Sequence, residues 1–260
     1  MNNKITKIPV TKNMALGFIY LNSYNHHLLY MKSQIMSKEL KRLQKLKPKE
    51  YSDREVNNLS QELIRIELIC NTVHYAEVFA SVLLAMKKHK QISKFLLEYQ
   101  VSEIKQFYKD LPKRKPQYIA KILQYPYPNK YVDKTLHKDL KITISQAHAE
   151  LKKLSKFYLR WQEFYNSYKH GFRTFSSWPD EKSDDTMTGY FAEKGKLDSF
   201  KVVIPQKHME DVSDLCIFML RFLDNAQKMF SQRVLEQKKE FSMTLLQKNP
   251  KKTSTTGEKK

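Results

Sequence analysis

The longest regular pattern in this sequence is an apolar and aromatic repeat within residues 138–171. Its members follow one another at spacings of three and four: Ile144, Ala147, Leu151, Leu154, Tyr158, Trp161, Tyr165 and Tyr168. Side chains at these spacings share one face of an α-helix, whereas those of a strand alternate with a period of two. The pattern therefore predicts a long core helix that ends near Gly171.

Similar but shorter patterns predict further helices on both sides of this segment. They cover about 13–45, 52–89, 91–110, 116–124 and 208–247. Pro48 ends the first of them, and Ser52 with Glu55 forms a capping box that predicts the start of the second. Because only a short loop joins these two long helices, we expect them to pack antiparallel.

The period changes between residues 172 and 206, where two β-prone runs suggest a small hairpin near 186–204. The predicted fold is therefore all-α, an antiparallel multi-helix bundle with a β-hairpin insertion. We expect one helical domain over residues 13–248, preceded by a flexible lead-in at 1–12. The polar, Lys-rich segment 249–260 is typical of a disordered basic tail.

Positive charge is the main feature of the composition. Lys and Arg number 47 against 27 Asp and Glu, which gives a net charge of +20. The densest basic stretch, 109–141, also holds Tyr118, Tyr125, Tyr127 and Tyr131. Such a field attracts polyanions, and tyrosines stack on bases, so RNA is the natural partner class. A general lysine bias, with the charge spread over the whole chain, explains the same composition.

Several classes of site are not indicated by the sequence. Only 5 glycines are present, and no phosphate-binding glycine loop or nucleophile elbow occurs, so we expect no cofactor. The eight histidines show no zinc-ligand spacing, and His26 and His27 are expected on opposite sides of a helix, so no metal is predicted. Cys70 and Cys216 lie among apolar residues, like buried thiols of a reducing compartment. Short apolar runs and a polar N-terminus indicate a cytoplasmic protein outside the membrane.

Side chains suited to chemistry gather where the long repeat ends. Asn166, His170 and Arg173 are spaced i, i+4 and i+7, and so line one face of a continuous helix. The pKa of an ordinary histidine lies near neutrality, which suits His170 to proton transfer in RNA cleavage. Lys169 or Arg173 would stabilise the phosphate, and Asn166 would orient the imidazole or a phosphate oxygen. The alternative is a helix C-terminus whose cations meet the helix dipole.

This cluster, on a late helix preceded by two long ones, resembles the HEPN superfamily (higher eukaryote and prokaryote nucleotide-binding). The family pattern is Arg, a polar residue, three variable residues and His. Asn166 and His170 match it, but Tyr165 stands in place of the Arg. The resemblance covers about 13–172. It implies a helical bundle, often a homodimer, that associates with RNA and in many members is a metal-independent endoribonuclease.

The replacement of the motif Arg leaves two functional interpretations open. In the first, His170 and Asn166 are catalytic, Lys169 and Arg173 bind the substrate, and Glu77 is accessory. Glu77 would hydrogen-bond His170 or pair with Lys169, or else be a solvated or structural residue. In the second, the protein is a non-catalytic helical module that binds nucleic acid or a protein partner.

Overall fold

The structure of the protein is a computed structural model. It describes residues 26–87, 100–122, 134–169, 174–177, 187–193, 197–203, 209, 211–225 and 227–228. Helices make up most of this part of the chain, so the predicted helical bundle is confirmed there. The predicted lead-in and the basic tail lie outside the described residues.

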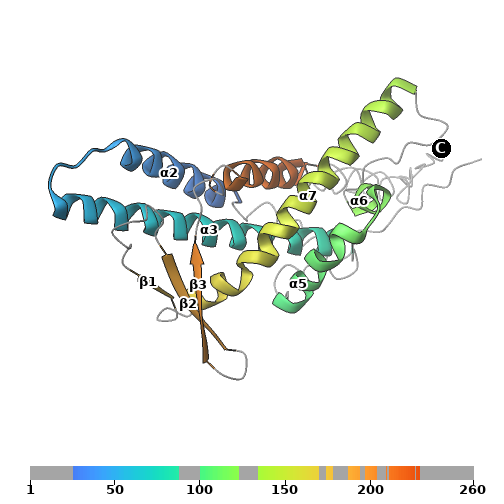
Figure 1. Ribbon diagram of the computed structural model, residues 1–260. Coiled ribbons are helices and arrows are strands. Elements are labelled where there is room, and N and C mark those ends of the chain that lie inside the picture. The colour runs from blue at the N-terminus through green and yellow to red at the C-terminus, as the bar shows by residue number, and fades with distance from the viewer. Residues whose placement is uncertain are drawn as a thin grey trace, which may run out of the picture.

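Two long helices form an antiparallel hairpin, as predicted from their short loop. They are α2 (His26–Lys45) and α3 (Tyr51–Lys87), which lie side by side in Figure 1. The capping-box prediction is wrong, because α3 begins at Tyr51 and Ser52 lies inside its first turn. The Arg54 amide already bonds the Glu50 carbonyl at 3.2 Å. The Arg54 guanidinium in turn donates to the loop carbonyls of Pro48 and Lys49, so loop contacts fix the helix start.

The long repeat forms α7 (Lys134–Lys169), which crosses α3 obliquely in Figure 1. All eight repeat residues lie in or against the core, from Ile144 at 3% exposure to the partly buried Tyr168. Tyr158 and Trp161 are among the largest fully buried side chains. The sequence pattern thus identified the core face of this helix correctly, since a 3/4 repeat of this length has few other ways to be buried.

Shorter helices pack against the middle of α7. They are α5 (Val101–Asp110), the 3-10 turn η2 (Leu111–Lys113) and α6 (Pro116–Ile122). Buried hydrogen bonds tie α5 on both sides: Tyr108 donates to the Ala76 carbonyl at 2.7 Å, and Ser155 donates to the Tyr108 carbonyl at 2.5 Å. The prolines expected to interrupt this region lie in η2 and at the first position of α6, where no amide hydrogen is needed.

Residues 211–225 form a helix that lies on the same side of α3 as α2 (orange-red in Figure 1). Its core contacts include the Phe79 and Phe222 rings, whose centroids are 5.1 Å apart. The Cys216 thiol lies 3.4 Å from the Ser33 hydroxyl and 3.5 Å from that of Thr72. Cys70 and Cys216 are free and buried, as predicted, and burial raises the pKa of both thiols.

Three strands follow α7 in the chain: β1 (Thr174–Ser177), β2 (Met187–Glu193) and β3 (Leu197–Val203). They pair antiparallel in the order β1-β2-β3, and β1 and β2 contact α7. The sheet stands beside the helical body near the end of α7 (Figure 1). β1 was not predicted, because a run of four residues is too short to show a period.

One helix in the described part of the chain, Tyr51–Ala85, is long and apolar enough to cross a membrane by those two criteria alone. Within its most apolar stretch, 89% of the residues are buried inside the protein. The central position of α3 in the core accounts for its composition, because α2, α5, α6 and α7 all pack against it.

Candidate functional site

The end of α7 carries two of the predicted site residues. Asn166 is half-buried there, and Lys169 is the last residue of the helix, with 41% of its side chain exposed. His170 and Arg173 lie outside the described residues. Glu77 comes from α3, 92 residues earlier in the chain, and belongs to the same site because its carboxylate reaches Lys169.

Lys169 and Glu77 form an ion pair, with Nζ and Oε2 separated by 3.2 Å. Glu77 is 1% exposed. Burial raises the pKa of its carboxyl group, and the charge of Lys169 with hydrogen bonds from Lys169 and Tyr158 opposes that rise only in part. Of the roles considered for Glu77, pairing with Lys169 is therefore the one found in the described residues, and the Lys169 cation is already partly neutralised.

Tyr165, which stands where the HEPN pattern has Arg, is buried under this pair. The Lys169 ammonium lies 4.0 Å from the centre of its ring, a cation–π contact. Its hydroxyl lies 2.9 Å from Nδ1 of His74. Burial and the nearby Lys169 and Lys32 lower the pKa of His74, which favours the neutral imidazole. Tyr165 thus belongs to a packed polar cluster and is no substitute for an exposed arginine.

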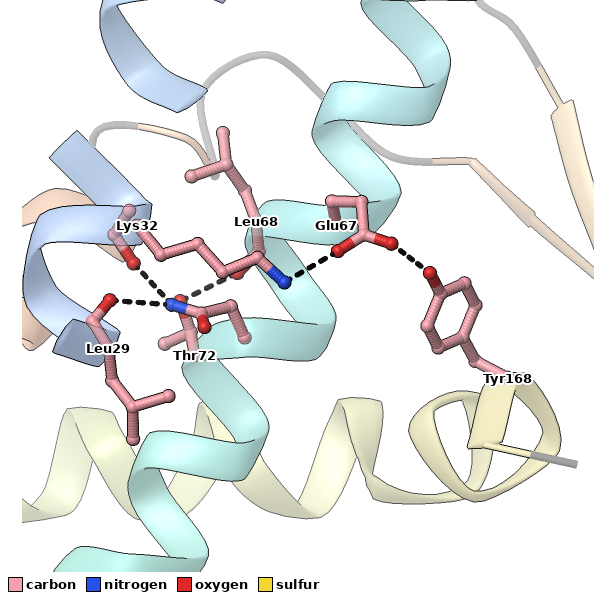
Figure 2. Close-up of polar contacts among 8 residues, drawn as sticks. Leu29, Lys32, Glu67, Leu68, Thr72 and Tyr168 are labelled. Carbon is pink, nitrogen blue, oxygen red and sulfur yellow. Dashed lines mark hydrogen bonds and ion pairs between the residues drawn. The ribbon is translucent and has the colours of Figure 1, made fainter. Parts of the chain in front are cut away.

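A second polar chain crosses the bundle beside the first. Figure 2 shows Glu67 of α3 between the Tyr168 hydroxyl, which donates to its Oε1, and the Lys32 ammonium, 2.9 Å from its Oε2. Burial opposes ionisation of Glu67, but the hydrogen bonds from Tyr168 and Lys32 and the charge of Lys32 hold its pKa below the ordinary value. Together with Lys169–Glu77, this chain makes the crossing of α3 and α7 a polar structural seam.

A basic turn lies on another face, between α5 and α6. Lys113, Arg114 and Lys115 are consecutive and exposed, and Lys109 precedes them one turn earlier. Among the described residues, no carboxylate pairs with any of these four side chains. Their charge is therefore available to a polyanion. The sequence drew attention to this stretch through its charge density but could not show which cations were unpaired.

The basic turn packs against α7 through His148. The pKa of this histidine is lowered by burial and by the charge of Lys152, while a hydrogen bond with the Arg114 backbone opposes the shift. Arg114 and Lys152 thus approach the same ring from two elements. The Arg114 guanidinium also lies 5.0 Å from the centre of the Tyr118 ring. An arginine, an aromatic face and further cations together form a surface suited to phosphate and base contacts.

A cavity of about 310 Å³ lies between α7 and the helix at 211–225. Its charged lining is mixed. Three cations, Lys153, Lys156 and Arg160, line it together with three carboxylates, Glu150, Asp211 and Asp214. Its apolar lining residues are Phe157, Trp161 and Leu215. Lys153 and Glu150 are 2.9 Å apart, and Glu150, with Asp211 and Asp214, raises the pKa of Lys153. Of the predicted site residues that the structure describes, Glu77, Asn166 and Lys169, none lines this cavity. Its near balance of charge makes it a poorer anion site than the basic turn.

One group of side chains in the described residues could hold a metal ion. His26 and His27 both direct Nε2 at Oδ1 of Asp224, at 2.8 and 3.0 Å. The prediction that these histidines point to opposite sides of a helix is wrong, since adjacent helix residues are only about 100° apart. Spacing rules did not reveal the group, because Asp224 is 198 residues from His26.

Comparison of the chain with protein-family models, with curated proteins and with solved structures finds no match in any of the three.

Proposed function

We propose that this is an RNA-associated helical protein, similar to HEPN domains, that binds the phosphate backbone on its basic turn. The observation that carries the proposal is the exposed run Lys113, Arg114 and Lys115, without a carboxylate partner in the described part of the chain. Three adjacent cations of this kind can neutralise phosphates, and binding is then favoured by release of the counterions condensed on the nucleic acid. In this proposal the strand segment after α7 is an insertion in the helical domain.

Two further features of the turn favour RNA over an acidic protein. The Arg114 guanidinium lies 5.0 Å from the centre of the Tyr118 ring, which places an exposed cation beside an aromatic side chain. Stacking of this kind recognises unpaired bases without selecting their sequence. The hydrogen bond between His148 of α7 and the Arg114 backbone also restrains the turn, so less conformational entropy is lost when it binds. We therefore expect single-stranded RNA to be the preferred ligand.

The test is fluorescence anisotropy with a labelled single-stranded RNA, measured over a range of salt concentrations. The variant Lys113→Ala/Arg114→Ala/Lys115→Ala should bind at least about tenfold more weakly, and its salt slope should fall by about 0.7 for each phosphate that is no longer neutralised. The matched control is Lys38→Ala/Lys41→Ala/Lys45→Ala on α2, which removes the same charge from exposed positions elsewhere. Equal weakening by both variants, or binding that does not depend on salt, would contradict the proposal. Salt-independent behaviour would point to a protein partner.

A second candidate function, metal-independent RNA cleavage, is favoured by the position of Asn166. It is half-buried near the end of α7, four residues before the expected base His170 in the sequence, and the nearby Lys169 is 41% exposed. In this proposal His170 and Asn166 are catalytic, Arg173 carries most of the phosphate contact, and Glu77 positions Lys169. Purified protein should then cleave single-stranded RNA in EDTA, and His170→Ala should abolish the products. Equal background cleavage by both proteins would leave only the binding function.

A further inference from the structure

We propose that His26, His27 and Asp224 form a binding site for a borderline divalent cation, with Zn²⁺ as the best fit. The site lies where the first turn of α2 meets the helix at 211–225, away from the proposed RNA surface on α5–α7. It is independent of the proposed function, because neither candidate activity uses these residues.

The three potential ligand atoms lie close together. The Asp224 Oδ1 atom is 2.8 Å from Nε2 of His26 and 3.0 Å from Nε2 of His27, and all three atoms lie within 4.8 Å of one another. The two imidazole rings are neighbours, with centroids 4.7 Å apart. Adjacent histidines on a helix usually diverge, so their common orientation toward a single carboxylate oxygen is a specific arrangement.

The donor set suits Zn²⁺ in number and type. Zinc takes imidazole nitrogens at about 2.0–2.1 Å and carboxylate oxygens at about 2.0–2.2 Å, and ions at catalytic sites commonly have three protein ligands plus water. Tetrahedral bonds of that length place ligand atoms about 3.3 Å apart. The contacts from Asp224 need therefore lengthen by only a few tenths of an ångström to admit an ion. Two neutral imidazoles and one carboxylate would leave a dication with a net charge of +1.

The surrounding structure holds the ligands in place without a metal. The Asn71 amide donates to the Leu29 carbonyl at 2.8 Å and to the Ser33 hydroxyl at 2.7 Å, which fixes α2 on α3. Ser33 also lies 3.4 Å from the Cys216 thiol, which connects α2 to the helix that carries Asp224. Because both supporting helices are fixed by these buried contacts, the ligands are preorganised.

The three ligand side chains are buried to different degrees, which would leave a bound ion accessible to solvent. The His26 side chain is 6% exposed, that of Asp224 30% and that of His27 51%. An ion bound here would be anchored on the buried histidine and would face solvent on the side of His27. Water can therefore reach it and complete its coordination. An ion at this place would link two helices that lie at opposite ends of the chain.

The alternative is a hydrogen-bonded cluster, in which one carboxylate oxygen accepts from two imidazoles. The two possibilities differ in what they require of the ligands. A metal site needs a lone pair from each Nε2 and so takes up Zn²⁺ with a defined stoichiometry, whereas a hydrogen-bonded cluster needs the protons on those nitrogens. Metal titration therefore separates them directly.

The experiment is titration of the tag-free, EDTA-treated full chain with Zn²⁺ by calorimetry and with Co²⁺ by visible absorption. We expect one Zn²⁺ per chain with a dissociation constant on the order of 1 µM or below, and no competition from Mg²⁺, which prefers oxygen ligands. His27→Ala and Asp224→Asn should each weaken binding at least about tenfold. The matched control Asp139→Asn, which removes an exposed carboxylate from α7, should have no effect.

Thermal unfolding of each variant in EDTA shows whether it is folded, and a given Zn²⁺ concentration should raise the midpoint of the parent chain more than that of His27→Ala. Absence of stoichiometric binding, or affinity unchanged in His27→Ala, would overturn the proposal. So would a sulfur-to-metal charge-transfer band with Co²⁺, which would place the ion on Cys70 or Cys216. RNA binding is measured in EDTA, so a negative result there is independent of this one.

Discussion

The end of α7 and the basic turn at 113–115 both have lysine or arginine on the surface, but they differ in whether a carboxylate neutralises that charge. Lys169 pairs with the buried Glu77 at 3.2 Å and lies over the Tyr165 ring. Lys113, Arg114 and Lys115 have no carboxylate partner among the described residues. A cation that compensates a buried carboxylate contributes to stability, whereas an unpaired exposed cation attracts polyanions.

The difference follows from which helix lies opposite each cation. Glu77 of α3 faces the end of α7, so the Lys169 cation is drawn to a buried carboxylate. The basic turn lies against His148 and Lys152, which offer no negative charge. A sequence motif rich in cations therefore says little about binding until the tertiary structure shows what faces each side chain.

The largest expected effect is on stability at the end of α7. Lys169→Met leaves the Glu77 carboxylate buried without its cation. Breaking a fully buried ion pair costs about 3–5 kcal/mol, and because Lys169 is 41% exposed we expect about 2 kcal/mol less free energy of unfolding. Urea denaturation measures this decrease in the free energy of unfolding. The double variant Lys169→Met/Glu77→Gln should recover most of this stability, and failure to recover it would show that Glu77 is not the cause.

The next effect compares the two regions directly in RNA binding. Arg114→Ala should weaken RNA affinity about threefold to tenfold, because it removes both a phosphate contact and a stacking surface. Lys169→Ala should change affinity less than twofold, roughly the scatter of such measurements, since its charge is already compensated. Anisotropy at one fixed salt concentration suffices. If Lys169→Ala proved the more damaging change, the end of α7 would be the RNA surface.

The stability of the protein measured over a range of pH tests the role of Glu77. Its folded-state pKa is raised above the ordinary value of 4.5. Between pH 4.5 and that raised pKa, the folded protein therefore binds more protons than the unfolded chain. Ionisation of Glu77 therefore lowers stability as pH increases, and it does so more strongly without Lys169. We expect the stability difference between parent and Lys169→Met to be smaller at about pH 5 than at about pH 7.5. A difference independent of pH would contradict the role given to Glu77.

The smallest effect concerns the stacking of Arg114 on Tyr118. Tyr118→Leu keeps an apolar side chain but removes the aromatic face, so we expect about 0.5–1 kcal/mol less stability and a modest decrease in RNA affinity. Thermal unfolding and anisotropy together measure this change. Tyr118→Phe, which keeps the ring, serves as the control and should behave like the parent. A decrease shared by both variants would assign the effect to the hydroxyl group.

Much of the helical framework was predictable, because the apolar periodicity of the sequence indicates where long helices lie, and in α7 it also identified the buried face. The 144–168 repeat, the antiparallel pairing of α2 with α3 and the buried thiols all followed from local pattern. Several helix ends also agreed with the prediction: α2 ends at Lys45, α5 ends at Asp110 and α6 begins at Pro116. The contacts at the start of α3 were not predicted, because Arg54 reaches back to loop carbonyls and no spacing rule includes such a contact.

The candidate sites were less predictable, since each joins residues far apart in the chain. Pairing of Glu77 with Lys169 was one of several options, and only the crossing of α3 over α7 selected it. The group of His26, His27 and Asp224 could not be found by spacing, because Asp224 lies 198 residues after His26.

The sequence by itself determined that this protein is a basic, mainly helical bundle and which face of α7 is buried. Period and composition are local properties, and they sufficed for α7; in α2, where Leu28, Met31 and Ile35 are exposed and Ser33 is buried, they did not. The tertiary structure decided which cations are neutralised, where a carboxylate is buried and which imidazoles meet. Those outcomes depend on distances between separate helices, and electrostatic energy is governed by distance and burial, which a linear pattern does not contain.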